Sequence, residues 1–279
     1  MIYNKLYNKI YTNLKEIYYS IYEFIFLRIV RVQYYFLENS KSNDLPLVSI
    51  IIATYNRSNI LLNRTLPSIL AQSYKNIEII IVGDKCIDNT AFLLKNHPDK
   101  RVKFYDLQKR GVYPSNIKDR WFVQGTAPRN KGMKLAKGKW FVFISDDDIL
   151  FPNHVETLLI NAIKRDVEFL SASYETVKQG KNLIVDPVNF GTVDNPCLIG
   201  GMQTWIYKSY LKFFKWNIDS WRKEWNRPVD YDLQIRFLNA GVKFGHIYDI
   251  VYYNPPVEGT NTTGYEAAII AEDLIKISN

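Results

Sequence analysis

The chain has 279 residues, of which 47% are hydrophobic and 23% charged, and its formal net charge is +8. This composition is typical of a soluble globular protein, and the length allows one large α/β domain or two small ones. The positive charge favours phosphates or anionic lipid as partners. No Lys/Arg cluster with interleaved aromatic residues supports a nucleic-acid partner. Cys86 and Cys197 match no metal or redox spacing, so we expect free thiols in a reducing compartment, the cytoplasm.

Residues 1–38 are predicted to form an amphipathic helix, because Tyr, Leu and Ile recur at helical spacing on one face. Scattered polar residues exclude a signal peptide. Glu23, Arg28 and Arg31 interrupt the apolar run that a membrane-spanning helix would need. Three alternatives remain for the apolar face: contact with a membrane surface, packing on the rest of this chain, or pairing with a second copy in a homo-oligomer. Membrane contact would make the protein peripheral at the inner face of the membrane.

A polar stretch before Pro46 predicts a domain boundary, and strands then alternate with helices. We expect an N-terminal extension with its linker at 1–45, a main domain at 46–260 and a C-terminal helix at 261–279. The alternation of strand and helix is typical of a parallel doubly wound sheet. The first predicted elements are strands at 48–53, 78–82 and 102–105, a helix at 58–73 that Pro67 kinks or divides, and a helix that Asp88 caps and that ends near Asn96.

The second half of the main domain is less regular. Residues 108–125 lack periodicity and are predicted to form a long functional loop. Two helices are expected to end at Gly138 and Gly241, because glycine suits the left-handed residue that follows a helix. The further predicted elements are helices at 128–137, 152–165, 230–240 and 265–277, strands at 140–144, 167–174, 183–186 and 243–253, and a loop at 255–264.

Three consecutive carboxylates, Asp146, Asp147 and Asp148, follow the apolar run 140–144. Adjacent anions repel one another unless a cation lies among them. Carboxylate oxygens suit Mg²⁺ or Mn²⁺, which are commonly shared with substrate phosphates. The alternative is a solvated acidic turn that caps the next helix. The triplet by itself favours neither interpretation.

Two further polar clusters follow predicted strands: Thr54-Tyr55-Asn56-Arg57 and Asp84. The carboxyl ends of parallel strands meet at one edge of a sheet, so we expect these clusters and the acidic triplet at one cleft. An aromatic ring can pack on a base, an isolated acid can accept from a base N–H, and a metal can bridge a diphosphate. Together these groups suit a nucleoside diphosphate.

Three ordered blocks resemble family 2 glycosyltransferases with the GT-A fold. Leu47 to Thr90 resembles the opening of that family, and GTAPRNKGMKLAKGKWFVFISDDDILFP resembles the block that ends in its DxD-type metal motif. PVDYDLQIRFLNAGVKF resembles the block that holds the catalytic acid. Three blocks in order are far more specific than a single motif. The resemblance implies an α/β fold with a Rossmann-like, mostly parallel central sheet and helices on both faces.

The resemblance also implies roles for individual residues. Tyr55 matches the residue that packs on the base, and Asp84 matches the acid that reads the base, usually uracil, which implies a UDP-sugar. Arg129 and Asn130 match the start of a helix that borders the donor site. The implied donor-site residues are Thr54, Tyr55, Asn56, Arg57, Asp84, Arg129, Asn130 and Asp146, the implied Mn²⁺ or Mg²⁺ ligands are Asp146, Asp147 and Asp148, and the implied catalytic base is Asp230.

This sequence departs from the family pattern at three places. Gly83 replaces the commoner Asp of an Asp-Asp pair, and Val229 stands where Glu usually precedes the base. The family often has a late His as a further metal ligand, but after Asp230 the sequence has only His246, inside a strand pattern. The triplet would therefore supply most of the protein's share of the metal coordination.

The implied reaction is an inverting transfer from a nucleotide sugar to a hydroxyl of a saccharide or lipid-linked saccharide, in surface polysaccharide or lipooligosaccharide synthesis. The alternative is a catalytically silent nucleotide-sugar-binding or scaffold protein. Among the remaining polar residues, His154 is expected to face solvent from a helix, and Asp232 to be a surface or supporting acid. Four tryptophans could line an acceptor pocket or form a core, namely Trp205, Trp216, Trp221 and Trp225.

Overall fold

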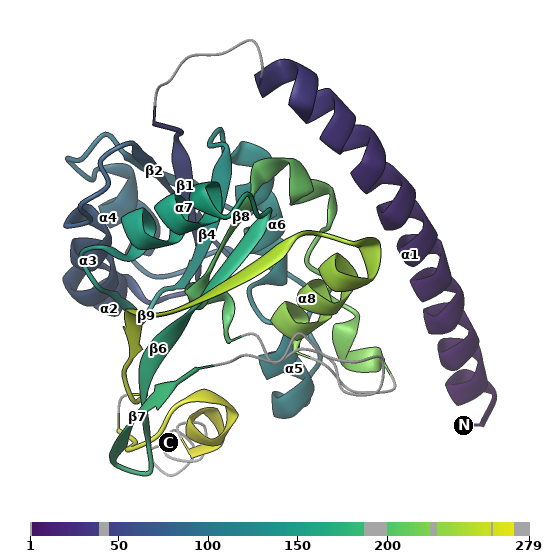
Figure 1. Cartoon of the computed structure of the whole chain (residues 1–279). Helices are drawn as coiled ribbons and strands as arrows, with labels where there is room; N and C mark the ends of the chain where they lie inside the picture. Colours follow the sequence, from purple (N-terminus) through teal and green to yellow (C-terminus); the bar gives the residue numbers. More distant parts are fainter. Residues whose placement is uncertain (1, 39–44, 187–199, 224–227, 258, 271–279) are drawn as a thin grey trace.

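A mostly parallel sheet forms the centre of the molecule (Figure 1). The computed structural model describes residues 2–38, 45–186, 200–223, 228–257 and 259–270. Within these residues the strand order is β3-β2-β1-β4-β8-β6-β9-β5, and β7 pairs with β6. Neighbouring pairs among β1 to β4 are parallel, as are β6 and β9, whereas β8 runs antiparallel to β4 and β6. The strands are β1 (Val48–Thr54), β2 (Ile77–Gly83), β3 (Val102–Asp106), β4 (Trp140–Ser145), β5 (Ile149–Leu150), β6 (Phe169–Lys178), β7 (Lys181–Val185), β8 (Trp205–Lys208) and β9 (Phe244–Asn254).

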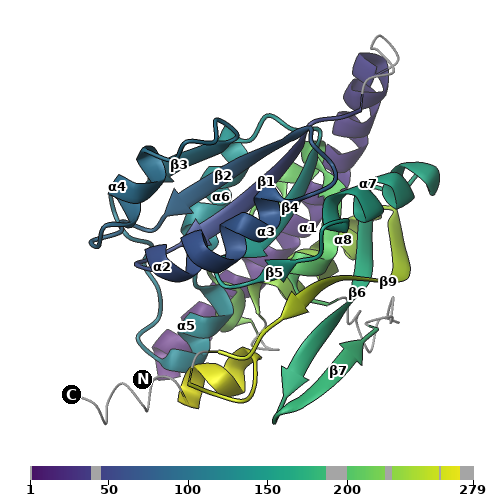
Figure 2. The same cartoon turned by 90° about the vertical axis from the view of Figure 1, so that its left-hand side faces the viewer.

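Helices cover both faces of this sheet, so its central strands are apolar on both sides. Ile50 and Ile52 of β1 face a core shared with α3, α4 and α7, whereas Ile51 faces a second core shared with α6 and α8. Figure 2 shows α2 and α3 in front of the sheet and α1 and α8 behind it. The helices are α1 (Ile2–Glu38), α2 (Ser58–Ile60), α3 (Leu66–Leu70), α4 (Thr90–Lys95), α5 (Ile117–Val123), α6 (Thr126–Leu135), α7 (His154–Lys164) and α8 (Val229–Ala240), with 3-10 turns η2 (Met202–Thr204), η3 (Ser209–Phe213) and η4 (Ser220–Arg222) and a further helix at 264–270.

The predicted strands and most predicted helices are confirmed within a few residues, and residues 271–277 of the last predicted helix lie outside the described residues. The helix predicted at 58–73 is divided, with a π-helical turn, η1 (Leu61–Thr65), between α2 and α3 and with Pro67 in the first turn of α3. The long loop predicted at 108–125 is wrong in part, because α5 lies inside it. Asn116 caps α5 by accepting from the backbone N–H groups of Lys118 and Asp119.

Gly138 and Gly241 have different structural roles. Gly241 follows α8 with φ +84°, the left-handed residue that the sequence predicted. Gly138 is not such a residue, because α6 ends at Leu135 and its capping residue, Ala136, is extended. A Cβ at Gly138 would lie 2.6 Å from the Ser49 nitrogen and 2.8 Å from the Leu47 oxygen. Glycine is therefore required there by the close approach of the chain entering β4 to the start of β1.

The register of the parallel strands aligns their carboxyl ends. Thr54 of β1 pairs with Gly83 of β2, and Gly83 pairs with Asp106 of β3. On the other side of β1, Ala53 pairs with Ser145, the last residue of β4. The turns after β1, β2 and β4 therefore leave the sheet side by side, and these turns carry the three polar clusters that the sequence indicated.

Helix α1 packs on the rest of the chain, one of the three alternatives for residues 1–38. Leu27 is fully buried in the core that contains α8, and the ring of Phe26 contacts Phe213 of η3. Arg31 makes two hydrogen bonds with the Glu168 carboxylate, and Glu23 forms a buried ion pair with Arg236 of α8. In the described parts of the chain, none of the helices has the length and apolar character needed to cross a bilayer.

The expectation that His154 faces solvent is wrong. His154 is 0% exposed, and its Nδ1–H donates to the carbonyl of Val251 at 3.0 Å. Burial lowers the pKa of His154 to about 4, so the ring is neutral at pH 7. Trp205 and Trp216 are also buried and stack on each other, so they belong to the core and not to an acceptor pocket. Trp225 and Cys197 lie outside the described residues.

Candidate active site

The acidic turn after β4 is held by a cation from the turn after β1. Nη1 of Arg57 donates to Asp146 Oδ1 at 3.1 Å and to Asp147 Oδ2 at 2.7 Å. Thr54 Oγ1 donates to the other oxygen of Asp146 at 2.7 Å. The charges of Asp146 and then Asp147 raise the pKa of Arg57. The turn leads into β5 and not directly into a helix, so the helix-capping alternative does not describe it.

Asp148 points inward, away from this arginine contact. Its Oδ2 accepts the Ser145 backbone N–H at 2.9 Å, and the residue is 2% exposed. Burial and then the neighbouring Asp147 charge raise the pKa of Asp148 to about 8. Burial also raises the pKa of Asp146, although Arg57 opposes that shift. The triplet therefore crowds three carboxyl groups into a site that excludes most water, where a bound cation would favour their ionised forms.

The donor groups of this turn fit a divalent cation that is shared with a ligand. In the described parts of the chain, no three acidic, His or Cys side chains converge as a complete metal cage would. Asp146 and Asp147 nevertheless share one cationic group, because both accept from Arg57. Mg²⁺ is commonly held by one or two carboxylates plus substrate phosphates, so two adjacent carboxylates are sufficient on the protein side. The ligand roles of Asp146, Asp147 and Asp148 remain predictions.

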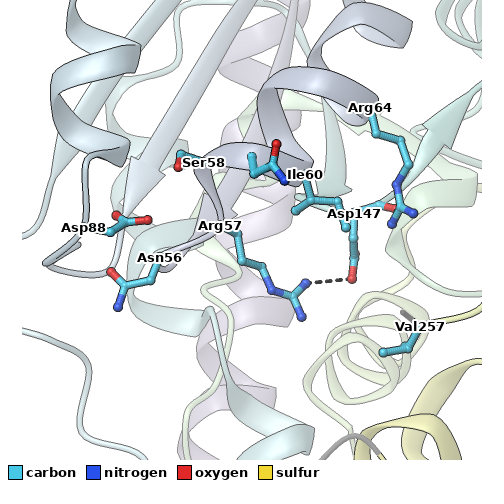
Figure 3. A pocket seen from close by; sticks show the side chains of 9 residues that line it. Asn56, Arg57, Ser58, Ile60, Arg64, Asp88, Asp147 and Val257 are labelled. Atoms are coloured by element: carbon cyan, nitrogen blue, oxygen red, sulfur yellow. Dashed lines mark hydrogen bonds and ion pairs between the residues drawn. The ribbon is translucent and has the colours of Figure 1, made fainter. Parts of the chain in front are cut away.

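A pocket of about 370 Å³ opens beside Asp147 (Figure 3). Figure 3 shows the guanidinium groups of Arg57 and Arg64 near the Asp147 side chain. Nη2 of Arg64 donates to the Asp147 carbonyl at 2.5 Å. Two arginines at the mouth of an acidic site favour an anionic ligand that brings its own cation, such as a metal diphosphate. The pocket is lined by Asn56, Arg57, Ser58, Asn59, Ile60, Arg64, Asp88, Asp147 and Val257.

Tyr55 and Asp84, the two residues expected to contact the base, both contact the segment that contains Arg110 and Gly111. The guanidinium carbon of Arg110 lies 3.7 Å from the centre of the Tyr55 ring. The next residue, Gly111, donates its backbone N–H to Asp84 Oδ1 at 2.8 Å. Burial and then the Asp84 carboxylate raise the pKa of Tyr113. A planar cation on Tyr55 and an N–H donor on Asp84 are the contacts that a stacked base would make, and the sequence analysis did not single out Arg110.

The structure explains why Gly83 replaces the commoner aspartate. A Cβ at Gly83 would lie 2.3 Å from Asp106 Oδ1 and 3.0 Å from Cys86 Sγ. Asp106, the last residue of β3, accepts the Cys86 backbone N–H at 3.1 Å. The turn after β2 therefore takes a carboxylate from the neighbouring strand, and an acid at position 83 would have to displace the Asp106 side chain from this contact. The pattern of the sequence contained no signal for Asp106, because the contact depends on sheet register.

Asp230 lies in the first turn of α8, and the cap residue of that helix is Pro228, so Asp230 is not the helix cap. Its Oδ1 accepts the Tyr231 backbone N–H at 2.9 Å. Burial raises the pKa of Asp230, and the Arg129 charge opposes that shift. Burial lowers the pKa of Arg129, and the carboxylates of Asp230, Asp146 and Asp148 oppose that shift. Burial also raises the pKa of Tyr252, as do the charges of Asp148, Asp147 and Asp230. Asp230 and the triplet therefore lie within electrostatic range of the same two residues.

Other predicted site residues have structural partners. Asn56 has φ +53° and accepts the Ile87 backbone N–H, which links the turns after β1 and β2. The side-chain amide of Asn130 makes two hydrogen bonds of 2.9 Å with the Trp216 backbone. His246 lies in β9, with its ring nitrogen 2.8 Å from the Ser171 hydroxyl. The donor-binding roles of Asn56 and Asn130 therefore remain predictions.

Comparison with known proteins identifies the family. The model of Glycosyl transferase family 2 matches residues 49–230, and the chain belongs to this family. It is 28% identical to Escherichia coli chondroitin synthase over 251 residues, which cover 87% of this chain and 34% of that enzyme. It is 26% identical over 173 residues to the Escherichia coli UDP-Glc:alpha-D-GlcNAc-diphosphoundecaprenol beta-1,3-glucosyltransferase WfgD, covering 60% of this chain and 63% of that protein. The chain thus spans less than two thirds of each relative.

Solved structures share the fold at low sequence identity. Staphylococcus aureus TarS 1–349 in complex with UDP-GlcNAc has a TM-score of 0.57 and 19% identity, covering 77% of this chain and 60% of that chain. The mannosyltransferase PcManGT from Pyrobaculum calidifontis in complex with GDP-Man and Mn²⁺ has a TM-score of 0.57 and 14% identity, covering 94% and 75%. The expected GT-A fold, with its curled, mostly parallel sheet, is confirmed.

Proposed function

We propose that this protein is a metal-dependent, inverting glycosyltransferase that uses a nucleotide-sugar donor, with UDP-sugars as the first candidates. One observation carries the proposal: in a chain of this family, Asp230 and two acids of the triplet, Asp146 and Asp148, all lie within electrostatic range of the same buried arginine, Arg129. The relative TarS binds UDP-GlcNAc, and the relative PcManGT binds Mn²⁺ with GDP-Man. These comparisons support a nucleotide-sugar donor and a divalent cation in this chain.

In the proposed reaction Asp230 takes the proton from the acceptor hydroxyl as that oxygen attacks the anomeric carbon. A buried carboxylate with a raised pKa suits this task, because it holds the proton more tightly than an exposed one would. The bond from the anomeric carbon to the diphosphate breaks in the same step, so the configuration inverts. Fixing donor and acceptor in line supplies much of the remaining rate enhancement.

The leaving diphosphate would be held by Arg57, Arg64 and the acidic turn. Bound Mg²⁺ or Mn²⁺ would supply charge neutralisation for the departing nucleoside diphosphate, with Asp146, Asp147 and Asp148 as the candidate ligands. Tyr55 would pack on the base and Asp84 would accept from its ring N–H. The charge of Arg129, which interacts with those of Asp230, Asp146 and Asp148, would help to orient these three acids.

For the acceptor we propose a hydroxyl of a saccharide or lipid-linked saccharide, in the synthesis of a surface polysaccharide or lipooligosaccharide. The relative WfgD acts, as its name says, on a diphosphoundecaprenol-linked saccharide, and chondroitin synthase makes a polysaccharide. A lipid-linked acceptor would place the reaction at a membrane surface, and we propose the inner face, in the cytoplasm. The alternative, a silent nucleotide-sugar-binding protein, predicts donor binding without turnover.

The proposed function is tested by donor binding and turnover with metal present. We expect UDP with Mn²⁺ to raise the melting temperature, and UDP-sugars to release UDP when saccharide acceptors are added. Asp147→Ala should weaken Mn²⁺-dependent UDP binding by roughly tenfold or more, because it removes a carboxylate from the candidate cation site. Asp166→Ala removes an exposed acid elsewhere and should bind as the wild type does. Binding without UDP release across donors and acceptors would favour the silent protein.

Arg110→Ala should tighten the binding of UDP by roughly twofold to fivefold, because an exposed cation–π contact of modest strength must be broken before a base can stack on that face of Tyr55. Isothermal titration with UDP and Mn²⁺ would measure the change. Lys109→Ala removes a neighbouring exposed cation without touching Tyr55 and controls for the lost charge. Weaker binding by Arg110→Ala alone would instead mean that Arg110 contacts the bound base.

A further inference from the structure

Helix α1 has a long apolar face that no other described part of the chain covers. Of the 25 large hydrophobic residues that are exposed in the described structure, 13 lie on this helix between Ile10 and Phe36. Scattered exposed apolar residues are normal on a soluble protein, but a contiguous patch marks an interaction surface. Figure 1 shows α1 along the outer edge of the molecule, beside α8. We call the exposed face between residues 10 and 36 the outer face of α1.

The charges of α1 are distributed unequally between its two faces. Its acids Glu16 and Glu23 pair with Lys223 and Arg236 of the domain, with Glu23 buried and Glu16 with 42% of its side chain exposed at the edge of the contact. Lys15 and Arg31 also face inward and pair with Asp219 and Glu168. The sole charged residue exposed on the outer face is Arg28. An apolar face with one cation and no acid is complementary to a surface of lipid with anionic headgroups.

The spacing of the outer face also favours a flat surface over a second helix. Ile10, Leu14, Ile17, Ile21, Ile25, Ile29, Val32 and Phe36 mark the stripe, and its seven intervals span 26 residues. The mean interval is about 3.7 residues, longer than the 3.5 that keeps a stripe in the seam of a two-stranded coiled coil. The stripe therefore drifts around the helix and broadens the apolar face, instead of following a narrow seam with a second helix.

The aromatic residues of the outer face fit the same partner. Tyr11, Tyr18, Tyr22 and Tyr35 are exposed there. A tyrosine ring has an apolar body and a polar hydroxyl, so it is stable at the boundary between headgroups and acyl chains. Next to the helix, Lys212 of η3 is exposed and adds a second cation on the side of the domain that α1 covers. An amphipathic helix of this kind lies in the interface and does not span it.

We propose that the outer face of α1 docks this protein on the surface of an anionic lipid bilayer. Docking requires no detachment of α1, because the ion pairs with Lys223, Arg236, Asp219 and Glu168 lie on the opposite face of the helix. Helix α8, which carries Asp230, packs directly against α1, so the proposed active site would be held at a constant distance from the lipid surface. If the proposed function holds, docking would also bring the enzyme close to a lipid-linked acceptor.

The experiment is co-sedimentation of the full chain with vesicles of phosphatidylcholine and phosphatidylglycerol in equal parts, without donor or acceptor. We expect the chain to partition onto the vesicles. The double variant Ile17→Ser/Ile21→Ser should reduce the partition coefficient by roughly tenfold or more, because it removes two apolar side chains from the interface. These residues are 57% and 58% exposed, so the substitutions should not impair folding.

The matched control is Ile160→Ser/Ile163→Ser in α7, where the two side chains are 51% and 52% exposed. It should partition like the wild type. Failure of the wild-type chain to sediment with vesicles, or equal losses in both double variants, would overturn the proposal. Analytical ultracentrifugation tests the alternative that a second copy of the chain covers the outer face of α1. If the wild type is a dimer that does not bind vesicles, and Ile17→Ser/Ile21→Ser converts it to a monomer, the face belongs to a second copy and the proposal is overturned. Because no sugar nucleotide is present, these results do not depend on whether the chain transfers sugar.

Discussion

Asp230→Asn should lower the turnover of donor and acceptor by roughly 10²- to 10⁴-fold, the typical contribution of a positioned general base. The amide keeps the shape of the carboxylate and can still accept the Tyr231 N–H, but it cannot take a proton. UDP affinity should stay within about twofold of the wild type, because the carboxylate is required for the chemical step and not for the proposed contacts with the nucleotide. Steady-state rates and UDP titration measure the two effects separately.

The pH dependence gives a second readout of the same residue. The base works only when deprotonated, and burial raises the pKa of Asp230. The rate should therefore fall as the pH decreases through a pKa above that of an ordinary aspartate, and Asp230→Asn should lose this acid limb. Asp249→Asn, an exposed acid on β9, should keep the wild-type rate and profile. An unchanged rate in Asp230→Asn would remove Asp230 as the base.

Glu23→Ala should lower the free energy of unfolding by about 3 kcal/mol or more, because it leaves a buried arginine without one of its two carboxylates. Glu23 is 2% exposed, and its carboxylate pairs with Arg236, whose side chain is 11% exposed. Arg236 retains Asp232 and the Lys215 carbonyl, which limits the loss. Urea unfolding followed by circular dichroism measures the change as a shift of the midpoint.

Glu16→Ala provides the matched control for this prediction. Glu16 lies on the same helix and pairs with Lys223, but its side chain is 42% exposed. Its partner Lys223 is only 8% exposed but keeps the carboxylate of Asp232, so the exposed Glu16 contributes at most about 1 kcal/mol and this variant should unfold near the wild-type midpoint. Equal effects of the two substitutions would show that the Glu23 pair is not buried as described. The comparison also tests whether α1 is an integral part of the domain that holds α8.

Much of the fold follows from local pattern. The apolar runs of β1, β2 and β4 are buried on both faces, and their composition alone predicts central strands. The division of the helix at 58–73 and its relation to Pro67 also follow from local chemistry. Local pattern failed to predict α5 at residues 117–123, because this helix has only seven residues and its main local signal is the Asn116 cap. Such a short segment has too few turns for hydrophobic periodicity to be recognised.

His154 shows a second limit of local pattern. It begins α7 at a position that sequence alone suggests is exposed, yet β9 passes over it and supplies the Val251 carbonyl. The burial of a polar residue depends on a partner that is 97 residues away in the chain. The same holds for Asp232, which is 0% exposed because Lys223 and Arg236 pair with it.

The sequence by itself determined which residue types stand at the carboxyl ends of the strands: an aromatic residue and an arginine after β1, an acid after β2 and three acids after β4. These follow from the linear order of buried strands and polar turns. Only the tertiary structure decided how they meet. Arg57 bridges two acids of the triplet, Asp148 points inward, and Arg110 covers Tyr55, because sheet register and loop packing set these contacts. The face of α1 that packs on α8 was likewise decided by ion pairs with residues more than 130 positions away.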